Sequence, residues 1–109
     1  MTRIFPVTLL LFLFIHIAQA QLVTSVFKVS GNCEMCKSRI ETAVDVKGVK
    51  QADWDIITGD LKIKYDSSRV SIDRLMKLIS EVGHDTPSHK ADTLIYNKLH
   101  TCCQYRKPD

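Results

Sequence analysis

Two cysteines separated by two residues could bind a metal ion or undergo redox chemistry. Cys33 and Cys36 stand where a segment with a two-residue apolar period gives way to one with helical spacing. At the N-terminus of a helix, unpaired backbone N–H groups and the helix dipole favour anions, so a thiol there ionises more readily to the metal-binding thiolate. Two thiolates suit soft ions of low coordination number, Cu(I) above all. A closed zinc site takes four ligands, and the sequence has neither a second Cys-x-x-Cys nor a zinc-finger His pair.

A second cysteine pair, Cys102 and Cys103, lies close to the end of the chain. In an oxidising compartment, an even number of cysteines in a short chain is typical of a disulfide framework, but adjacent cysteines form only a strained ring. The lengths of the segments before this pair allow it to reach Cys33 and Cys36 without requiring it. The pair could supply shared metal ligands, a disulfide partner or an independent thiol pair, and the sequence does not decide among them.

Periodicity predicts the elements that position the first pair. Residues 23–29 alternate as a half-buried strand, and residues 36–47 have helical spacing before a glycine. Residues 52–56 and 61–65 alternate on either side of a Thr-Gly-Asp turn, which predicts a hairpin.

A second helix and a last strand complete the pattern. Ser71 can cap a helix whose apolar stripe continues to Val82 and places Met76 in the core. Residues 84–90 could form a last strand that Pro87 restricts to a sheet edge. The order predicts an α+β sandwich of the split βαβ type, with two helices on a four-stranded antiparallel sheet, followed by a short C-terminal helical tail over residues 92–99.

The first twenty residues predict a signal peptide. A short basic start is followed by a mainly apolar run over residues 4–17 and by Ala18-Gln19-Ala20, a small-x-small cleavage site. The alternative is an uncleaved membrane anchor, but an apolar run of about 14 residues is shorter than the roughly 20 that span a bilayer. Cleavage after Ala20 would leave Gln21 first in a soluble, exported protein, either periplasmic or secreted.

The charge and composition do not indicate a nucleic-acid-binding protein or an enzyme. The formal net charge is +3, and the basic residues are interspersed with acidic ones and have no row of aromatics between them, so no nucleic-acid surface is expected. The aspartates are scattered and no glycine-rich phosphate loop is present, so the sequence does not indicate an enzyme.

At this point the sequence resembles the heavy-metal-associated domain of copper chaperones, copper P-type ATPases and the periplasmic mercury-binding protein. The resemblance covers about residues 22–90 and implies a ferredoxin-like βαββαβ fold for a domain over residues 21–90, followed by a C-terminal extension over residues 91–109. It also implies that Cys33 and Cys36 bind the ion on an exposed loop and exchange it with a membrane metal transporter or another metal-binding domain. The matching segments are Val29–Lys37, Ile40-Glu41, Gly48-Val49, Thr58-Gly59, Tyr65-Asp66 and Ile79–His84.

The sequence also departs from this family. The family usually carries Gly-Met-Thr-Cys, whereas this chain has Gly31-Asn32-Cys33, one residue shorter and without the methionine. The metal preference therefore cannot be copied, and Hg(II), Zn(II) and Cd(II) stay open beside Cu(I). His84 stands where copper chaperones often carry tyrosine, which leaves it as a metal neighbour or a surface residue. Met35, inside the Cys-x-x-Cys, is expected to face solvent or a partner.

Three functions fit these residues. The leading interpretation is a metal carrier or buffer. A thiol-disulfide oxidoreductase could use the same cysteines, although a thioredoxin core needs a cis-proline after its second helix and a longer chain beyond it. A structural or interaction domain with oxidised cysteines is the third.

Overall fold

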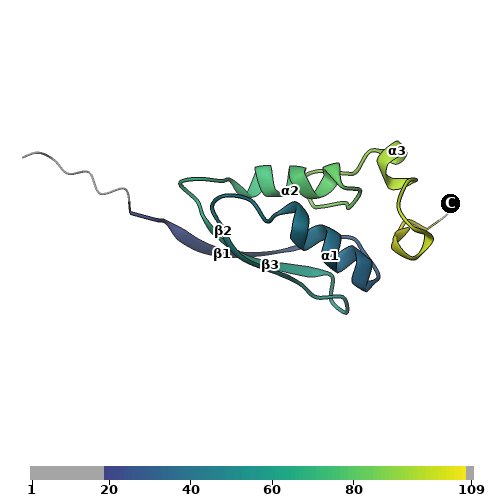
Figure 1. Ribbon diagram of the computed structural model, residues 1–109, viewed down its shortest axis with the longest axis horizontal. Helices are drawn as coiled ribbons and strands as arrows, with labels where there is room; N and C mark the ends of the chain where they lie inside the picture. Colours follow the sequence, from purple (N-terminus) through teal and green to yellow (C-terminus); the bar gives the residue numbers. More distant parts are fainter. Residues whose placement is uncertain (1–18, 108–109) are drawn as a thin grey trace, which may run out of the picture.

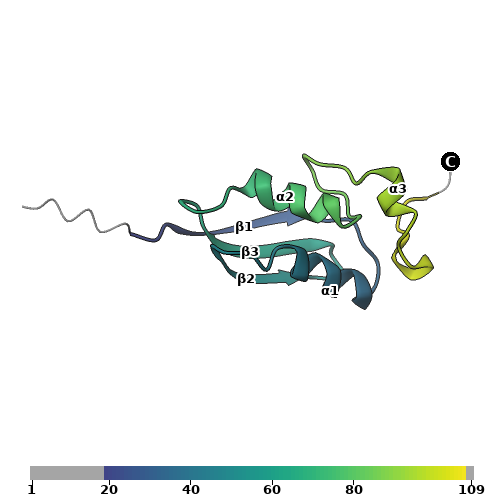
Figure 2. The ribbon, with the colours of Figure 1, turned by 45° about the horizontal axis from the view of Figure 1, so that its top comes forward.

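The computed structural model describes residues 19–107, which form an antiparallel sheet covered on one face by two helices (Figures 1 and 2). The predicted signal peptide, residues 1–20, lies outside this part except for its last two residues. Within residues 19–107, no helix combines the length and apolar character needed to cross a membrane. The elements are β1 (Leu22–Lys28), α1 (Glu34–Ala43), β2 (Val49–Trp54), β3 (Asp60–Asp66), α2 (Ile72–Glu81), α3 (Thr93–Tyr96) and a 3-10 turn, η2 (Thr101–Cys103).

The central strand of the sheet is β3, which pairs with β1 on one side and β2 on the other. Because side chains alternate along a strand, Leu61, Ile63 and Tyr65 face the helices and are buried, while the lysines between them are exposed. The predicted hairpin is confirmed. Its first strand, β2, ends at Trp54, however, so Ile56 lies in the turn rather than in the strand.

Both helices bury the residues that the apolar spacing indicated. Ile40 of α1 and Leu75 and Ile79 of α2 are fully buried, and burial of each such side chain contributes about 1.5–3 kcal/mol. Met76 belongs to the same core, as predicted. Ser71 caps α2, since its hydroxyl accepts a hydrogen bond from the Arg74 N–H at 3.1 Å.

The predicted fourth strand over residues 84–90 is not formed in the described part of the chain, where the sheet has three strands. Instead, Thr86 makes a local turn: its N–H donates to the carbonyl oxygen of His89 at 2.8 Å. Pro87, inside that turn, has no N–H to offer a neighbouring strand. One backbone hydrogen bond, from Ser30 N–H to the Asp85 carbonyl, joins this segment to the loop after β1.

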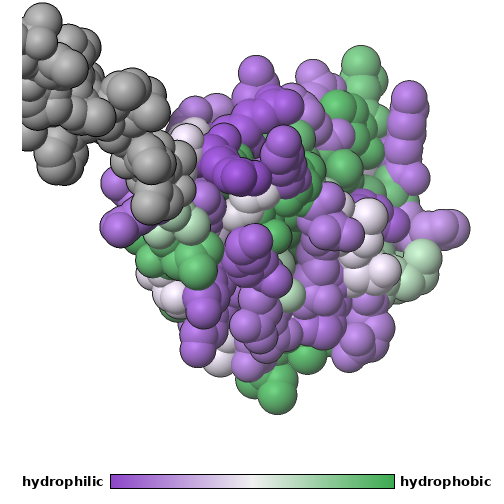
Figure 3. All heavy atoms as spheres, turned by 60° about the vertical axis from the view of Figure 1, so that its left-hand side comes forward, coloured by the Kyte–Doolittle hydropathy of each residue, from purple (hydrophilic) through white to green (hydrophobic). Residues whose placement is uncertain are grey.

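The C-terminal segment folds back to the end of the molecule where α1 begins (Figure 1). The helical tail predicted over residues 92–99 is a single turn of helix, Thr93–Tyr96, which Asp92 caps by accepting a hydrogen bond from the Leu94 N–H. Leu99 then packs so closely on Gly83 that a Cβ at Gly83 would lie 3.0 Å from the leucine side chain. The opposite end of the molecule is covered mainly by hydrophilic side chains (Figure 3).

Candidate metal centre

A buried tryptophan supports the loop that carries the first cysteine pair. The indole N–H of Trp54 donates to the carbonyl oxygens of Val29 and Gly59, both at 3.1 Å. A Cβ built on Gly31 would lie 3.0 Å from the indole ring, so the backbone rests directly on it. The β1–α1 loop is therefore held by packing against the sheet although it lies at the surface.

Cys33 and Cys36 lie at the N-terminus of α1. Cys33 is the N-cap residue in an extended conformation, and its carbonyl accepts a hydrogen bond from the Lys37 N–H at 3.1 Å. Its side chain is partly exposed, whereas Cys36 in the first turn is fully buried. Their Sγ atoms are 3.1 Å apart. The structure thus brings together the two thiols predicted as metal ligands.

Cys103 approaches the same place from the C-terminal segment. Its Sγ is 3.0 Å from that of Cys33. The sulfurs of Cys33, Cys36 and Cys103 all lie within 4.8 Å of one another, and we call this set the thiol cluster. It offers three soft donors to one ion and no carboxylate, which suits soft metals rather than Mg²⁺ or Ca²⁺.

Cys102 lies at the margin of the thiol cluster. Its side chain is exposed, with Sγ 3.7 Å from Cys33 Sγ and 3.6 Å from Met35 Sδ. Met35 is 43% exposed, in agreement with its predicted orientation toward solvent. The two adjacent cysteines of the tail therefore occupy different environments, one buried and one exposed.

The thiols differ in acidity. Burial raises the pKa of Cys33, but hydrogen bonds from the thiols of Cys103 and Cys36 lower it by more, to about 7. For Cys36, burial raises the pKa to about 12. For Cys102, chiefly its hydrogen bond to Cys33 raises the pKa to about 11. Of these three thiols, Cys33 therefore ionises first and presents a thiolate near neutral pH.

His84, which the sequence left open as a metal neighbour or a surface residue, is buried and is not part of the thiol cluster. Its ring is fully buried, and Nδ1 lies 2.8 Å from the carbonyl oxygen of Ser30 and must donate to it. Nε2 then accepts from the Arg39 guanidinium at 3.4 Å. Burial lowers the pKa of His84, with Arg39 acting in the same direction. Both ring nitrogens are thus engaged within the protein, and His84 links the loop after β1 to Arg39 of α1.

The sequence did not indicate four residues that shape this site. Asn32 accepts a hydrogen bond from Cys36 Sγ through Oδ1 at 3.6 Å. Asp85, Tyr105 and Arg106 hold the tail against the loop after α2. The signal available in the sequence was the Tyr-Arg dipeptide two residues beyond Cys103, which lies outside the part of the chain that resembles the family.

Comparisons with known proteins place this geometry in context. No family model matches the chain. The copper chaperone CopZ of Staphylococcus aureus (strain JH9) is 33% identical over 55 residues, which cover 50% of this chain and 81% of that protein. CopZ of Staphylococcus haemolyticus (strain JCSC1435) is 29% identical over 66 residues, covering 59% of this chain and 97% of the relative.

Solved structures with a similar fold include a protein of the same kind as these relatives. A CopZ metallochaperone superposes with a TM-score of 0.57 and 30% identity, covering 59% of this chain and 98% of that one. Oxidized MerP from Ralstonia metallidurans CH34 superposes with a TM-score of 0.57 over 60% of this chain and 93% of its own, at 24% identity, and so shows likeness of fold alone.

Proposed function

Because the chain belongs to the heavy-metal-associated domain family, whose members include copper chaperones, we propose that it binds Cu(I) between Cys33 and Cys36 and passes the ion on by ligand exchange. The role is that of a carrier or buffer without catalysis of its own.

The observation that carries this proposal is the pairing of one accessible thiol with one buried thiol at a helix N-terminus. Cys36 is fixed in the core, while Cys33 is partly exposed and has a pKa of about 7. A soft d¹⁰ ion such as Cu(I) accepts two or three sulfur ligands. Hg(II), Zn(II) and Cd(II) share the preference for thiolate, and the test below separates them from Cu(I).

Transfer follows from the difference between the two thiols. An incoming thiolate from a partner can approach on the side of Cys33, form a new Cu–S bond and displace the Cys33 sulfur, which leaves as a thiolate. Cys36, held in the core, is the last ligand to leave. No change in the oxidation state of copper is required, and the suitable partner is a membrane metal transporter or another domain with paired cysteines.

We include export in the proposal, because residues 1–20 have the three-part layout of a signal peptide. The mature protein would begin at Gln21 and meet its metal in the periplasm or outside the cell. A mass spectrum of exported protein that still contained residues 1–20 would exclude this part of the proposal and leave metal binding untouched.

The central experiment is competition for Cu(I) between a colorimetric Cu(I) chelator and the reduced mature protein, with native mass spectrometry for stoichiometry. Wild-type protein should bind one Cu(I) tightly. The double variant Cys33→Ser/Cys36→Ser should lose this binding while its circular dichroism stays that of a folded protein. Parallel titrations with Zn(II), Cd(II) and Hg(II) rank the four ions by their affinity for the protein.

Cys102→Ser provides the matched control, since it removes an exposed thiol at the margin of the cluster. Retained affinity in the Cys33/Cys36 double variant would overturn the proposal. Rapid turnover of a disulfide substrate by the metal-free protein would instead favour the oxidoreductase.

A further inference from the structure

We propose that Cys103 is a third ligand to the ion held by Cys33 and Cys36, so that the C-terminal tail closes the site over the metal. This inference rests on the proposed function and concerns the same site. Three observations support it: the position of the sulfur, the burial of the side chain and the contacts that fix the tail.

The sulfur positions suit a three-coordinate ion. With a metal–sulfur distance of about 2.3 Å, as for zinc thiolates, three sulfurs in a trigonal plane lie about 4 Å apart. The three sulfurs of the thiol cluster lie within 4.8 Å of one another, and Cys33 contacts both of the others. Separating the closest pairs by about 1 Å would admit the ion, and Cys33, which is partly exposed, has room to move.

Burial distinguishes Cys103 from its neighbour. Cys103 is fully buried in the hydrophobic cluster of the domain, whereas Cys102 is exposed. A metal bound by Cys33 and Cys36 alone would have an open side facing the tail. Cys103 places a sulfur on that side, at the contact between η2 and the start of α1.

The tail is anchored on both sides of Cys103. Before it, Leu99 packs on Gly83. After it, the Tyr105 hydroxyl donates to the Gly83 carbonyl at 2.7 Å and accepts from the Asp85 N–H at 2.8 Å, while its ring stacks on His84.

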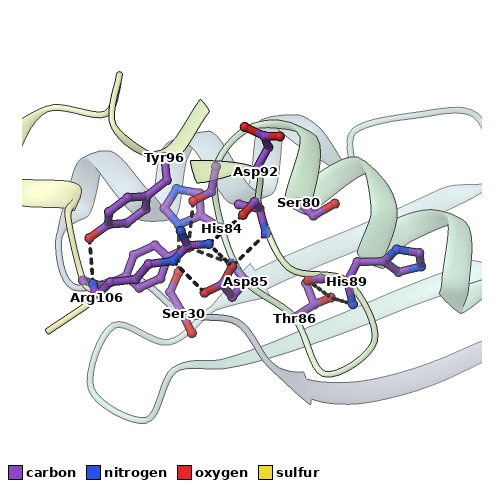
Figure 4. Close-up of polar contacts among 12 residues, drawn as sticks. Ser30, Ser80, His84, Asp85, Thr86, His89, Asp92, Tyr96 and Arg106 are labelled. Carbon is purple, nitrogen blue, oxygen red and sulfur yellow. Dashed lines mark hydrogen bonds and ion pairs between the residues drawn. The ribbon is translucent and has the colours of Figure 1, made fainter. Parts of the chain in front are cut away.

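Arg106 completes this anchor, which we call the latch (Tyr105 and Arg106 on the loop after α2). Its guanidinium pairs with Asp85 at 2.8 Å, donates to the Ala91 carbonyl at 2.7 Å and lies 4.4 Å from the centre of the Tyr96 ring (Figure 4). The pair is largely shielded from solvent, and the Arg106 hydrogen bonds hold the pKa of Asp85 below its usual value despite burial, which acts in the opposite direction. Contacts fixed on both sides leave Cys103 little freedom to leave the cluster.

X-ray absorption spectroscopy of the Cu(I)-loaded, reduced mature protein tests the inference, because it counts the sulfurs around the metal. Wild-type protein and Cys102→Ser should each show three sulfurs, and Cys103→Ser should show two. Loss of one direct ligand should also lower the affinity for Cu(I) by at least about tenfold in chelator competition, because loss of an outer-shell partner alone lowers metal affinity about 10–100-fold. Cys102→Ser should bind like wild type.

Two sulfurs around Cu(I) in the wild-type protein would overturn the inference without reference to any variant. So would equal affinities of wild type and Cys103→Ser. Either result would leave the proposed function intact, since that depends on Cys33 and Cys36 and fails only if their double variant still binds Cu(I).

Discussion

The Sγ atoms of Cys33 and Cys103 lie 3.0 Å apart although 70 positions separate them in the sequence. Cys33 belongs to the loop between β1 and α1, and Cys103 belongs to the C-terminal extension after α2. Because these two sulfurs are in contact, the metal affinity and the stability of the loop that carries Cys33 depend on the fold of the tail. Two predictions follow this dependence, one for metal selectivity and one for stability.

Removing residues 101–109 should weaken the binding of Zn(II) and Cd(II) more than the binding of Cu(I). A four-coordinate ion loses donors that it needs, whereas Cu(I) remains bound by two thiolates. We expect the affinity for Zn(II) and Cd(II) to fall about a hundredfold and the affinity for Cu(I) about tenfold. Competition titration of each reduced protein measures both changes. The full-length variant Cys102→Ser/Cys103→Ser should reproduce the effect, and unaltered affinities for all three ions would mean that the tail thiols are not ligands.

Tyr105→Phe should destabilise the latch. The substitution leaves the Asp85 N–H and the Gly83 carbonyl without their partner in a partly buried place, which costs about 1–3 kcal/mol. Urea denaturation of the reduced, metal-free protein measures this loss. Tyr65→Phe is the matched control, because the Tyr65 hydroxyl has one weak contact, with Ser25 at 3.4 Å, and its removal should cost less than about 1 kcal/mol. Equal losses in the two variants would show that the latch adds no stability.

Much of the fold could be predicted because local periodicity determines it. The alternation around Ile63 and the helical stripe through Leu75 each reflect which side of one element faces the core. The absence of the fourth strand reflects a local turn: Thr86 forms a hydrogen bond with His89, and no pattern of apolar residues signals this contact.

The site was predictable only in part. Cys33 and Cys36 are three positions apart at a helix N-terminus, so their proximity follows from local structure. The burial of His84 was not predictable, because the residue that stacks on its ring, Tyr105, comes from the tail. The position of Cys103 likewise depends on the ion pair between Asp85 and Arg106, which lie 21 positions apart. Such long-range contacts leave no periodic signal in the sequence.

Gly31→Ala should perturb the metal loop through Trp54. The added Cβ would lie 3.0 Å from the indole ring and 3.1 Å from Cys36 Cβ, and the buried ring has no space to retreat. Overpacking of this kind costs about 1–3 kcal/mol, and it should also weaken Cu(I) binding, since Cys36 must shift. Denaturation followed by the fluorescence of Trp54, the single tryptophan, measures the first effect. Ser30→Ala, at an exposed neighbour, should change neither quantity, and wild-type behaviour of Gly31→Ala would contradict the packing argument.

The stability of the metal-free protein should fall between pH 7.5 and pH 5.5 because of His84. Burial and Arg39 hold its pKa in the folded state below the ordinary value of 6.5, so in this range the unfolded chain binds a proton that the folded protein resists. The free energy of unfolding therefore decreases as the pH falls through 6.5, by up to about 1.4 kcal/mol from this residue.

The variant His84→Asn tests this prediction, because it keeps an N–H donor for the Ser30 carbonyl but cannot titrate. Urea denaturation at both pH values should give this variant a lower stability at pH 7.5 and a smaller decrease on acidification than wild type. His89→Asn is the control for an accessible imidazole, since His89 pairs with the exposed Asp73. A decrease in His84→Asn as large as that of wild type would show that the buried ring does not account for the acid sensitivity.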